Sequence, residues 1–309
     1  MKAVVYQKYG PPEVLQFKEI EKPSPRENEV LIKIRATTAH VGDTKMRSLN
    51  VSPSPVKRLL ARLVLGIFSP KRKILGMELA GEIEEIGNAV TKYATGDQVF
   101  ASTVPGMVFS AYAEYICLPE DWVMAHKPTN MTFEETAPIP GGGITSLGVL
   151  RKADIQSGQK VLIYGASGSV GTFSVQLAKY FGAEVTGVCS ASNFELVKSL
   201  GADKVIDYRT EDFTENGEVY DVIFDTVDKL SSTHAKKSLA ENGVYLNVDK
   251  SSNDLKLRSE DLVYLKELCE EGKFRAVIDR TYPFEQIVEA HRYVDKGHKK
   301  GNVAITIGH

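Results

Sequence analysis

Cysteine is scarce in this chain and widely spaced. Among 309 residues the only cysteines are Cys117, Cys189 and Cys269. This spacing offers neither a disulfide framework nor the paired cysteines of a structural zinc site, and it fits a reducing compartment. The first residues also turn polar at once, without the apolar stretch of a signal peptide. We therefore expect a cytoplasmic protein.

The chain also lacks a large net charge of either sign and has no long apolar run. The formal net charge of −2 gives no global basic field that would attract nucleic acid or an anionic membrane. The longest apolar stretch, 59–68, is interrupted by Arg62 and is too short to span a bilayer. These absences predict no nucleic-acid partner and no stable membrane association. The length instead suits two globular domains.

The hydrophobic pattern changes along the chain. Strand-like runs bounded by Pro, Gly and Asn, such as 30–34 and 81–86, are typical of the first part. From about Gly158 strands and helices alternate, which predicts a parallel sheet with helices on both faces. The expected strands are 161–164, 184–189, 204–208, 221–224 and 244–248, and the expected helices are 172–181 and 194–200.

This pattern predicts an α/β protein whose sheet stops at five parallel strands. A sixth strand would need a crossover of about a dozen residues or more, and the polar run 249–254 is too short to supply it before a helix at 262–269. A strand at 276–278, a helix at 284–294 and a strand at 303–307 complete the chain. We expect a β-rich domain from residues 1–125 and 251–309, and a doubly wound dinucleotide-binding domain from 126–250.

A glycine-rich turn carries the strongest chemical signal. Glycines at 165, 168 and 171 lie between an expected strand and an expected helix. Small residues there let the backbone approach a pyrophosphate, and the helix N-terminus supplies N–H donors. The alternative is a glycine-rich turn without a ligand, but the βαβ context favours a cofactor site. The predicted cofactor-binding residues of this turn are Gly165, Ser167, Gly168, Ser169, Val170 and Gly171.

The residues that follow the next strands bear on which dinucleotide binds. An NAD site usually carries an acid about twenty residues beyond the glycines, and the segment 189–193 has none. Ser190 and Asn193 are candidates to hydrogen-bond a 2′-phosphate, and Arg209, next to Tyr208, is a candidate to neutralise it. The pattern favours NADPH over NADH, and an ordinary polar loop remains the alternative.

A second motif resembles the signature of the medium-chain dehydrogenase/reductase superfamily, Gly-His-Glu-x2-Gly-x5-Gly-x2-Val. The chain has Gly76-Met77-Glu78, then Gly81, Gly87 and Val90, which match at every fixed position except the histidine. The resemblance covers essentially the whole chain. It implies a GroES-like, β-rich catalytic domain followed by a Rossmann-type domain.

The mismatch at Met77 implies that no catalytic zinc is bound. In zinc-dependent members that histidine is a metal ligand, and methionine is a poor zinc ligand. A second ligand, a cysteine, is also missing from residues 36–43, and no four-cysteine zinc lobe is present. What remains resembles the zinc-independent quinone oxidoreductase (zeta-crystallin-like) branch. This resemblance implies transfer of a hydride from NADPH to a quinone or to an enone or enal. A non-catalytic NADPH-binding protein and an alcohol dehydrogenase of the same superfamily remain alternatives.

The resemblance also indicates catalytic candidates. Asp43 matches the Asn-Pro-x-Asp loop of this branch, whereas His40 does not; His40 is either a donor to the substrate oxygen or a loop histidine bonded to backbone. Thr145 matches a threonine beside the nicotinamide, or caps a helix. Asn302 matches a residue that touches the cofactor, or belongs to a strand-edge turn. Lys45 is expected in solvent.

Two further expectations concern the surface. The basic, amphipathic stretch 56–73 is interpreted as a helical insert beside the active site rather than a membrane-surface helix, because the net charge is close to neutral. In relatives, dimers commonly join through the sixth strands of two sheets. Without that strand the usual dimer is doubtful, and we expect a monomer or an unusual dimer.

Overall fold

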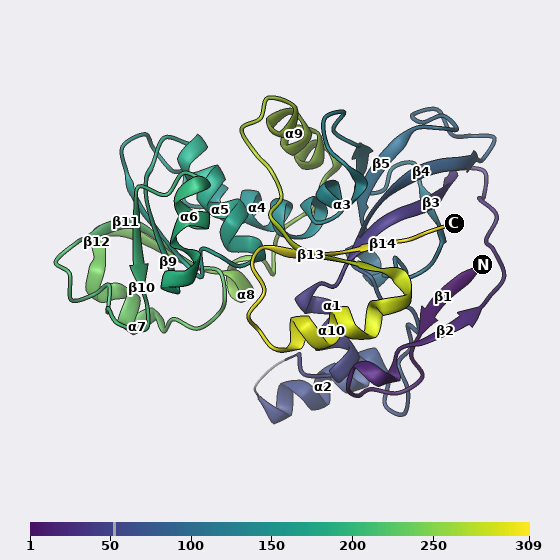
Figure 1. The fold of residues 1–309 in the computed structure, drawn as a ribbon, viewed down its shortest axis with the longest axis horizontal. Coiled ribbons are helices and arrows are strands. Elements are labelled where there is room, and N and C mark those ends of the chain that lie inside the picture. Colours follow the sequence, from purple (N-terminus) through teal and green to yellow (C-terminus); the bar gives the residue numbers. More distant parts are fainter. Residues whose placement is uncertain (52–53) are drawn as a thin grey trace. The chain divides into compact units, whose positions relative to one another are not determined.

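The computed structural model describes residues 1–51 and 54–309 (Figure 1). The chain forms two compact units. The first comprises Met1–Gly141, Arg258–Lys266 and Ile278–His309, and the second comprises Gly142–Leu257 and Glu267–Val277. The sequence predicted different boundaries, with one domain from 1–125 and 251–309 and the other from 126–250. That division into domains stays a prediction.

A seven-stranded sheet forms the frame of the first unit. Its order is β13-β14-β3-β4-β5-β7, and β6 also pairs with β3. The strands are β3 (Glu29–Thr38), β4 (Glu78–Ile86), β5 (Gln98–Ser102), β6 (Tyr115–Pro119), β7 (Met124–His126), β13 (Ile278–Pro283) and β14 (Asn302–Thr306). Among the described strands of this sheet, the β13–β14 pair alone is parallel. A separate hairpin joins β1 (Lys2–Val5) to β2 (Gln16–Glu19).

Buried side chains of these strands contribute to the core of this unit. In β3 the side chains of Val30, Ile32 and Ile34 are fully buried, and Ile32 pairs with Ile83 of β4. The predicted strands 30–34 and 81–86 are therefore confirmed, and both extend beyond the predicted bounds.

The helices of the first unit are short. They are α1 (Val41–Ser48), α2 (Pro55–Leu65), α3 (Phe133–Thr136), α10 (Ile287–Asp295) and the start of α9 (Ser259–Glu270), with 3-10 turns at 12–14, 105–107 and 284–286 and a π-helical turn at 139–143. α1 packs against α10 (Figure 1). This contact links the loop that begins at His40 to the C-terminal part of the chain.

The second unit is a doubly wound sheet of five parallel strands. Within the described part of the chain the order is β10-β9-β8-β11-β12, and every pairing is parallel. The strands are β8 (Lys160–Tyr164), β9 (Glu184–Cys189), β10 (Lys204–Asp207), β11 (Tyr220–Asp225) and β12 (Leu239–Asn247). The five-strand prediction is confirmed. After β12 the chain forms the four-residue helix α8 (Val248–Ser251), which is too short to cross over the sheet.

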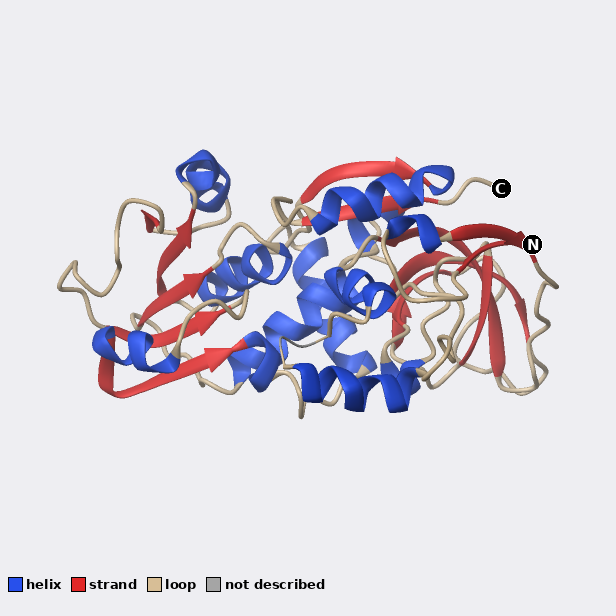
Figure 2. Ribbon diagram, turned by 90° about the horizontal axis from the view of Figure 1, so that it is seen from below, coloured by secondary structure: helices blue, strands red, loops and turns tan. Residues whose placement is uncertain are grey.

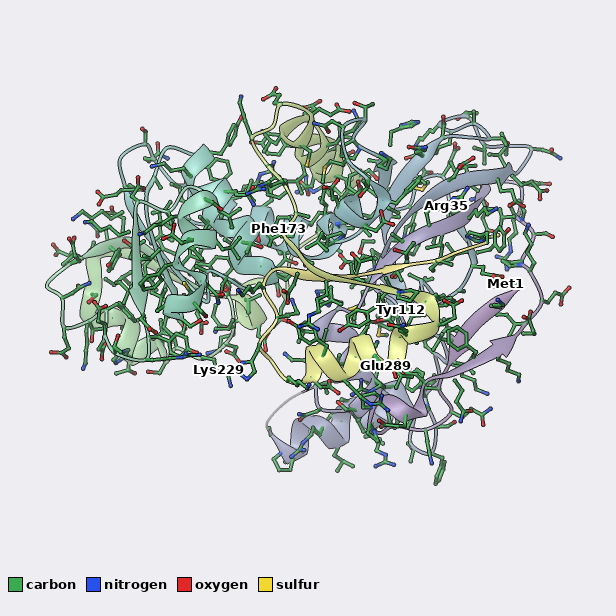
Figure 3. The ribbon with its side chains drawn as sticks, in the orientation of Figure 1. Met1, Arg35, Tyr112, Phe173, Lys229 and Glu289 are labelled. Carbon is green, nitrogen blue, oxygen red and sulfur yellow. The ribbon has the colours of Figure 1, made fainter. Side chains whose placement is uncertain are left out.

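Helices flank these strands (Figure 2). They are α4 (Ile144–Arg151), α5 (Ser169–Tyr180), α6 (Phe194–Ser199) and α7 (Ser232–Ala235), with 3-10 turns at 191–193 and 236–238. α4 packs against α5. On the buried side of α5, Phe173 stacks on Phe274 with ring centroids 5.0 Å apart (Figure 3).

The predicted strand at 276–278 is wrong in its bounds. β13 begins at Ile278 and ends at Pro283, where it pairs with β14. The prediction followed the apolar run Ala276–Ile278, whereas pairing with a neighbour decided where the strand lies. The predicted helix at 284–294 begins as a 3-10 turn and becomes α-helical only at Ile287.

Candidate functional site

The glycine-rich turn joins β8 to α5 in the second unit. Gly165 has a φ of +83°, and its N–H and that of Ala166 both donate to the Val188 carbonyl, at 2.9 and 3.0 Å. A Cβ on Gly171 would overlap the Gly165 carbonyl oxygen and lie 2.8 Å from the Cα of Ala166. Fold geometry therefore requires glycine at both positions.

Gly168 is different because the protein itself does not require a glycine there. Its φ is −80°, which any residue adopts, and a Cβ would meet only the Gly165 oxygen, at 3.4 Å. Gly168 is also the N-cap of α5 and gives it no side-chain cap. The N-terminus of a helix presents backbone N–H donors, so an open backbone at Gly168 and the donors of the first turn of α5 lie together here. This combination fits an anion such as a pyrophosphate.

A polar cluster follows β9 and contacts the same turn. The Asn193 side-chain amide donates to Ser167 Oγ at 3.0 Å and to Ser190 Oγ at 3.1 Å. Within the described part of the chain the buried Asn193 Oδ1 has no hydrogen-bond partner. The structure thus brings Ser190 and Asn193 onto the glycine turn. A buried acceptor without a partner beside the glycine-rich turn fits a ligand that donates a hydrogen bond.

Tyr208 and Arg209 lie in a separate cavity of about 570 Å³ at the carboxyl ends of the strands. The cavity is lined by Tyr164 and Val188, by residues 208–213 after β10, and by Lys229, Leu230, Ser231 and His234 after β11 (Lys229 is labelled in Figure 3). Both candidate side chains are exposed. The order of the strands reverses between β8 and β11, and ligands of doubly wound sheets bind at such a switch point. The glycine turn does not line this cavity.

Thr145 is the second residue of α4 and is half-buried. The interpretation of Thr145 as a helix cap is wrong, because Gly143 is the N-cap of α4 and no side chain caps it. Thr145 belongs to the second unit, as do the glycine turn and the Ser190 cluster. Its contact with a nicotinamide stays a prediction.

His40 is the N-cap of α1 in the first unit. Its Nδ1 accepts a hydrogen bond from the Gly42 N–H at 2.9 Å. The backbone bond expected for a loop histidine, one of the two interpretations of His40, is therefore present. Burial, and then the positive charges of Lys299 and Lys45, lower the pKa of His40 to about 4. The ring is therefore neutral near pH 7. Since Nδ1 accepts, the proton lies on Nε2, which is a donor. Lys45 itself is exposed, as expected.

Asp43 is fully buried in α1. Its Oδ1 accepts from the Gly76 N–H at 2.9 Å, while Oδ2 has no partner among the described residues. Burial raises the pKa of Asp43 to about 7, against the lowering effect of the Gly76 bond. The geometry shows Asp43 holding α1 against the turn that precedes β4. A catalytic role for its carboxyl stays a prediction.

Glu78 was not predicted as a site residue, yet it lies at the centre of a buried polar cluster. Its Oε1 accepts from the Thr38 hydroxyl, and its Oε2 accepts from the Gly141 N–H at 2.7 Å. Burial raises the pKa of Glu78 to about 8, and the nearby Lys299 opposes that rise. Burial in turn lowers the pKa of Lys299 to about 8. The available signals were that Glu78 is a fixed position of the superfamily signature and that it lies between apolar residues just before the predicted strand 81–86.

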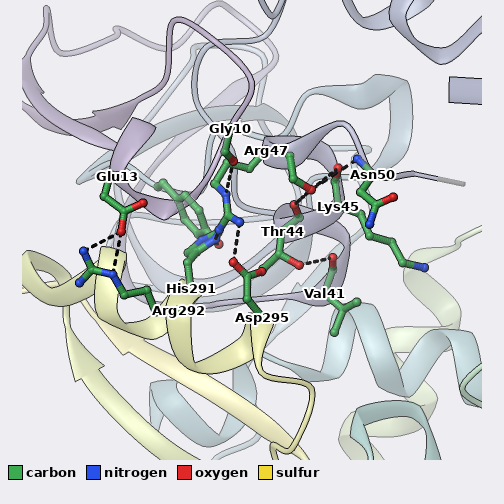
Figure 4. Close-up of polar contacts among 12 residues, drawn as sticks. Gly10, Glu13, Val41, Thr44, Lys45, Arg47, Asn50, His291, Arg292 and Asp295 are labelled. Atoms are coloured by element: carbon green, nitrogen blue, oxygen red, sulfur yellow. Dashed lines mark hydrogen bonds and ion pairs between the residues drawn. The ribbon is translucent and has the colours of Figure 1, made fainter. Parts of the chain in front are cut away.

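A chain of hydrogen bonds leads from this cluster to α10. The Tyr112 hydroxyl donates to the Thr38 carbonyl at 3.0 Å and lies 2.9 Å from His291 Nε2. His291 Nδ1 lies 2.9 Å from a guanidinium nitrogen of Arg47, which also pairs with Asp295 at 2.6 Å (Figure 4). Arginine only donates, so His291 accepts at Nδ1 and donates from Nε2 to Tyr112. Sequence offered no signal for this network.

Asn302 begins β14 and is buried. It belongs to the first unit, as do His40 and Asp43, whereas the other predicted cofactor residues belong to the second. Its contact with a cofactor stays a prediction.

Met77 packs over the His40 loop. A Cβ on Gly42 would lie 2.7 Å from the Met77 Cε and 2.9 Å from His40 Nδ1. A thioether therefore occupies the position of a family zinc ligand. In the described ranges no three His, Cys, Asp or Glu side chains are grouped so that they could hold a metal ion. Zinc independence stays a prediction that metal analysis can test.

Two protein families match the chain. Residues 26–128 match the family described as "Alcohol dehydrogenase GroES-like domain", and residues 169–290 match the one described as "Zinc-binding dehydrogenase". The chain is 32% identical to 2-methylene-furan-3-one reductase of Solanum lycopersicum over 325 residues, which cover 99% of this chain and 79% of the relative. It is 29% identical to the NADPH-dependent alkenal/one oxidoreductase, chloroplastic, of Arabidopsis thaliana, with the same coverage.

A solved structure agrees with these matches. The quinone oxidoreductase from Coxiella burnetii is similar with a TM-score of 0.87 and 29% sequence identity, over 100% of this chain and 99% of that chain. The Gly76–Val90 signature lies within the first matched range, 26–128, and α5 begins the second, 169–290. The chain is an oxidoreductase of the medium-chain dehydrogenase/reductase superfamily and belongs to its quinone oxidoreductase branch.

Proposed function

We propose that this chain is a zinc-independent, NADPH-dependent reductase of a quinone or an α,β-unsaturated carbonyl compound. The observation that carries the proposal is the bare Gly168 backbone at the uncapped N-terminus of α5. The names of the relatives support the acceptor class, since both plant enzymes are named for reduction of conjugated carbonyl compounds. The Coxiella burnetii structure is named as a quinone oxidoreductase.

The second unit binds the cofactor in this proposal. When it is bound, NADPH supplies the hydride. The backbone N–H groups in the first turn of α5 would hold the pyrophosphate, because a helix N-terminus offers N–H donors and a positive dipole end. The Ser190 hydroxyl donates a hydrogen bond to the ribose 2′-phosphate, and Arg209 neutralises it, with Tyr208 beside it. Asn193 was predicted to bond the same phosphate, but its amide N–H groups donate to Ser167 and Ser190, so its open Oδ1 would instead accept from a hydroxyl of the cofactor. Thr145 and Asn302 contact the nicotinamide half, as the family resemblance implies.

The first unit polarises the acceptor. His40 Nε2 donates a hydrogen bond to the carbonyl or quinone oxygen, where negative charge develops during reduction. A neutral imidazole with a pKa near 4 is a poor proton source at neutral pH, so the product is protonated from water. Asp43 positions the His40 loop through its bond to Gly76.

Oxidation of NADPH against a panel of acceptors tests the proposal. The panel contains ortho-quinones, enals, enones and simple alcohol/aldehyde pairs, with NADH in parallel and a chelator control. Turnover of a quinone or enone that prefers NADPH and is insensitive to chelator is the expected result. Binding of NADPH without turnover would favour a non-catalytic binding protein, and chelator-sensitive alcohol oxidation would favour an alcohol dehydrogenase.

The proposed setting is the cytoplasm, in line with the few, separated cysteines. The Arabidopsis thaliana relative is named as chloroplastic, so targeting differs within the superfamily or this expectation fails.

We also propose a monomer or an unusual dimer, because the sheet of the second unit has five strands in the described part of the chain. Light scattering that gives a stable dimer joined through these sheets would contradict this.

A further inference from the structure

Helix α2 turns its apolar side outward. Its apolar residues recur at spacings of three and four, which places them in one stripe along the helix. The exposed fractions are 67% for Val56, 62% for Leu59, 56% for Leu60, 51% for Leu63 and 56% for Val64. Ile67 and Phe68 follow directly, and Phe68 is 93% exposed. A surface helix normally buries such a stripe against the core. We call these seven residues the α2 face.

Contacts on the other side hold the α2 face in this orientation. Ala61 and Leu65 are only partly exposed. The Tyr9 hydroxyl donates to the Gly66 carbonyl at 3.2 Å, and the Lys71 N–H donates to the Leu65 carbonyl at 2.8 Å. The Tyr9 bond connects the end of the helix to a distant part of the first unit, and the Lys71 bond closes the helix end within its own segment. Neither bond involves a side chain of the apolar stripe.

The charged residues of the segment that carries the α2 face are all basic. Between Val51 and Met77 the sequence has six basic residues and no acidic one, although the whole chain has a formal charge of −2. Within the helix Arg58 and Arg62 are exposed, and Lys71, Arg72 and Lys73 are exposed beyond it. An apolar stripe flanked by cations is typical of helices that lie in the interface of an anionic bilayer.

We propose that the α2 face docks this protein reversibly on an anionic lipid surface. The apolar stripe enters the boundary between headgroups and acyl chains, and the flanking cations pair with anionic headgroups. A second copy of the chain fits less well, because it would bring two basic surfaces against each other. In the described part of the chain no helix has the length and apolar content needed to cross a membrane. Docking by one short helix remains reversible, so it does not conflict with the expectation of no stable membrane association. It does replace the interpretation of 56–73 as an insert rather than a membrane-surface helix, because that interpretation used the net charge of the whole chain and the charged residues of this segment are all basic.

Vesicle flotation with the full chain tests the proposal. Vesicles of phosphatidylcholine alone are compared with equimolar phosphatidylcholine and phosphatidylglycerol, at low salt and at about 1 M salt, where the Debye length falls to about 3 Å. Binding to the anionic vesicles at low salt, and its loss at high salt, is the expected result. Equal binding to both vesicle types, or to neither, would overturn the proposal.

Variants separate docking from general effects on the fold. Leu59→Gln with Leu63→Gln is expected to weaken vesicle binding at least tenfold, whereas Val263→Gln is not. Val263 is the matched control because it is also apolar and 43% exposed but lies on α9, which carries four acidic residues and one lysine. Thermal unfolding of each variant checks that it folds. If the double variant folds and floats like the natural chain, the α2 face is not the docking surface.

A tryptophan in place of Phe68 gives an independent readout. Phe68 is 93% exposed, so the new indole starts in water. Its emission is expected to shift to the blue when anionic vesicles are added and to stay unchanged with neutral ones. Light scattering in the absence of lipid tests the alternative that a second copy of the chain binds the α2 face. A concentration-dependent dimer that the Leu59→Gln, Leu63→Gln variant abolishes would assign the face to a second copy and overturn the lipid proposal.

Discussion

The guanidinium of Arg47 donates to Nδ1 of His291 across 2.9 Å, and both side chains are buried (Figure 4). Burial, and then the charge of Arg47, lower the pKa of His291 to about 3, so the ring stays neutral and can accept this bond. Replacement of His291 by phenylalanine leaves a buried guanidinium N–H without its acceptor and Tyr112 without its donor. We predict a loss of about 3 kcal/mol in the free energy of unfolding, measured by urea denaturation.

The neighbouring Arg292 provides a matched control. Its guanidinium pairs with Glu13 and Glu289 on the surface, where solvent screens the charges. Arg292→Ala is expected to leave the urea midpoint within error. If the His291 variant were as stable as the natural chain, the buried network would not stabilise the packing of α1 on α10.

The Glu78 carboxyl predicts an unusual pH dependence of stability. Burial raises its pKa from 4.5 to about 8, so the folded state holds this proton more tightly than the unfolded chain does. Its stabilising contribution is complete below pH 4.5 and is lost as the pH rises through about 8. We predict that the stability of the natural chain relative to Glu78→Gln falls with pH by up to about 1.4 kcal/mol per unit over this window.

Glutamine suits this position because its amide oxygen can accept from Gly141 and its nitrogen can donate to Thr38. Glu84→Gln is the control. Bonding to Lys22 lowers the pKa of Glu84, so its contribution is already complete above pH 4.5 and stays constant through pH 8. A difference between Glu78→Gln and the natural chain that is flat with pH would contradict the buried-proton account.

Gly168 and Gly171 are expected to respond differently to alanine. A Cβ on Gly168 fits the fold, with its nearest atom at 3.4 Å, but occupies the space offered to the pyrophosphate. We predict that Gly168→Ala keeps its melting temperature and weakens NADPH binding by about tenfold or more, roughly 1.4 kcal/mol. Gly171→Ala is expected to lose about 1–3 kcal/mol of stability, because its Cβ overlaps backbone. Titration of NADPH fluorescence and thermal unfolding separate the two effects; unchanged NADPH affinity in Gly168→Ala would remove the loop from the cofactor site.

His40 combines a structural and a proposed chemical role, and two substitutions separate them. Asparagine can still accept from the Gly42 N–H as a helix cap, but it lacks the Nε2 donor; alanine lacks both. We predict that both variants lower kcat by about 10²–10³-fold, while only alanine lowers stability, by about 1 kcal/mol.

The pH profile adds a second check on His40. Because its pKa is lowered to about 4, protonation of this ring should not change kcat between pH 6 and 8. A kinetic pKa near 6.5 that disappears in His40→Asn would show instead that the ring titrates normally and acts as a general acid.

How far the sequence predicted the structure depends on the distance between interacting residues along the chain. The five-strand sheet follows from the alternation of strands and helices along the chain, and the glycine turn follows from the spacing of its glycines. Both were therefore predictable. The partners Arg47 and His291 are 244 positions apart, and Glu78 depends on Gly141 and Lys299. No local pattern contains such pairs. For the same reason β13 was misplaced, because its bounds depend on pairing with β14.

The α2 segment shows a related limit. Its periodicity predicted an amphipathic helix, and the structure contains one at Pro55–Leu65. Periodicity gives the width of an apolar stripe but not its direction. Burial shows that the stripe faces outward, which a sequence pattern cannot reveal.

The most direct test of the central claim follows the hydride itself. The protein, pretreated with chelator, is supplied with NADPH deuterated at nicotinamide C4 and with an enone, and the product is analysed by mass spectrometry and NMR. The account predicts a saturated ketone that carries deuterium at the former β-carbon, with NADPH preferred over NADH. Deuterium on the carbonyl carbon, with activity that returns only when zinc is added, would contradict it.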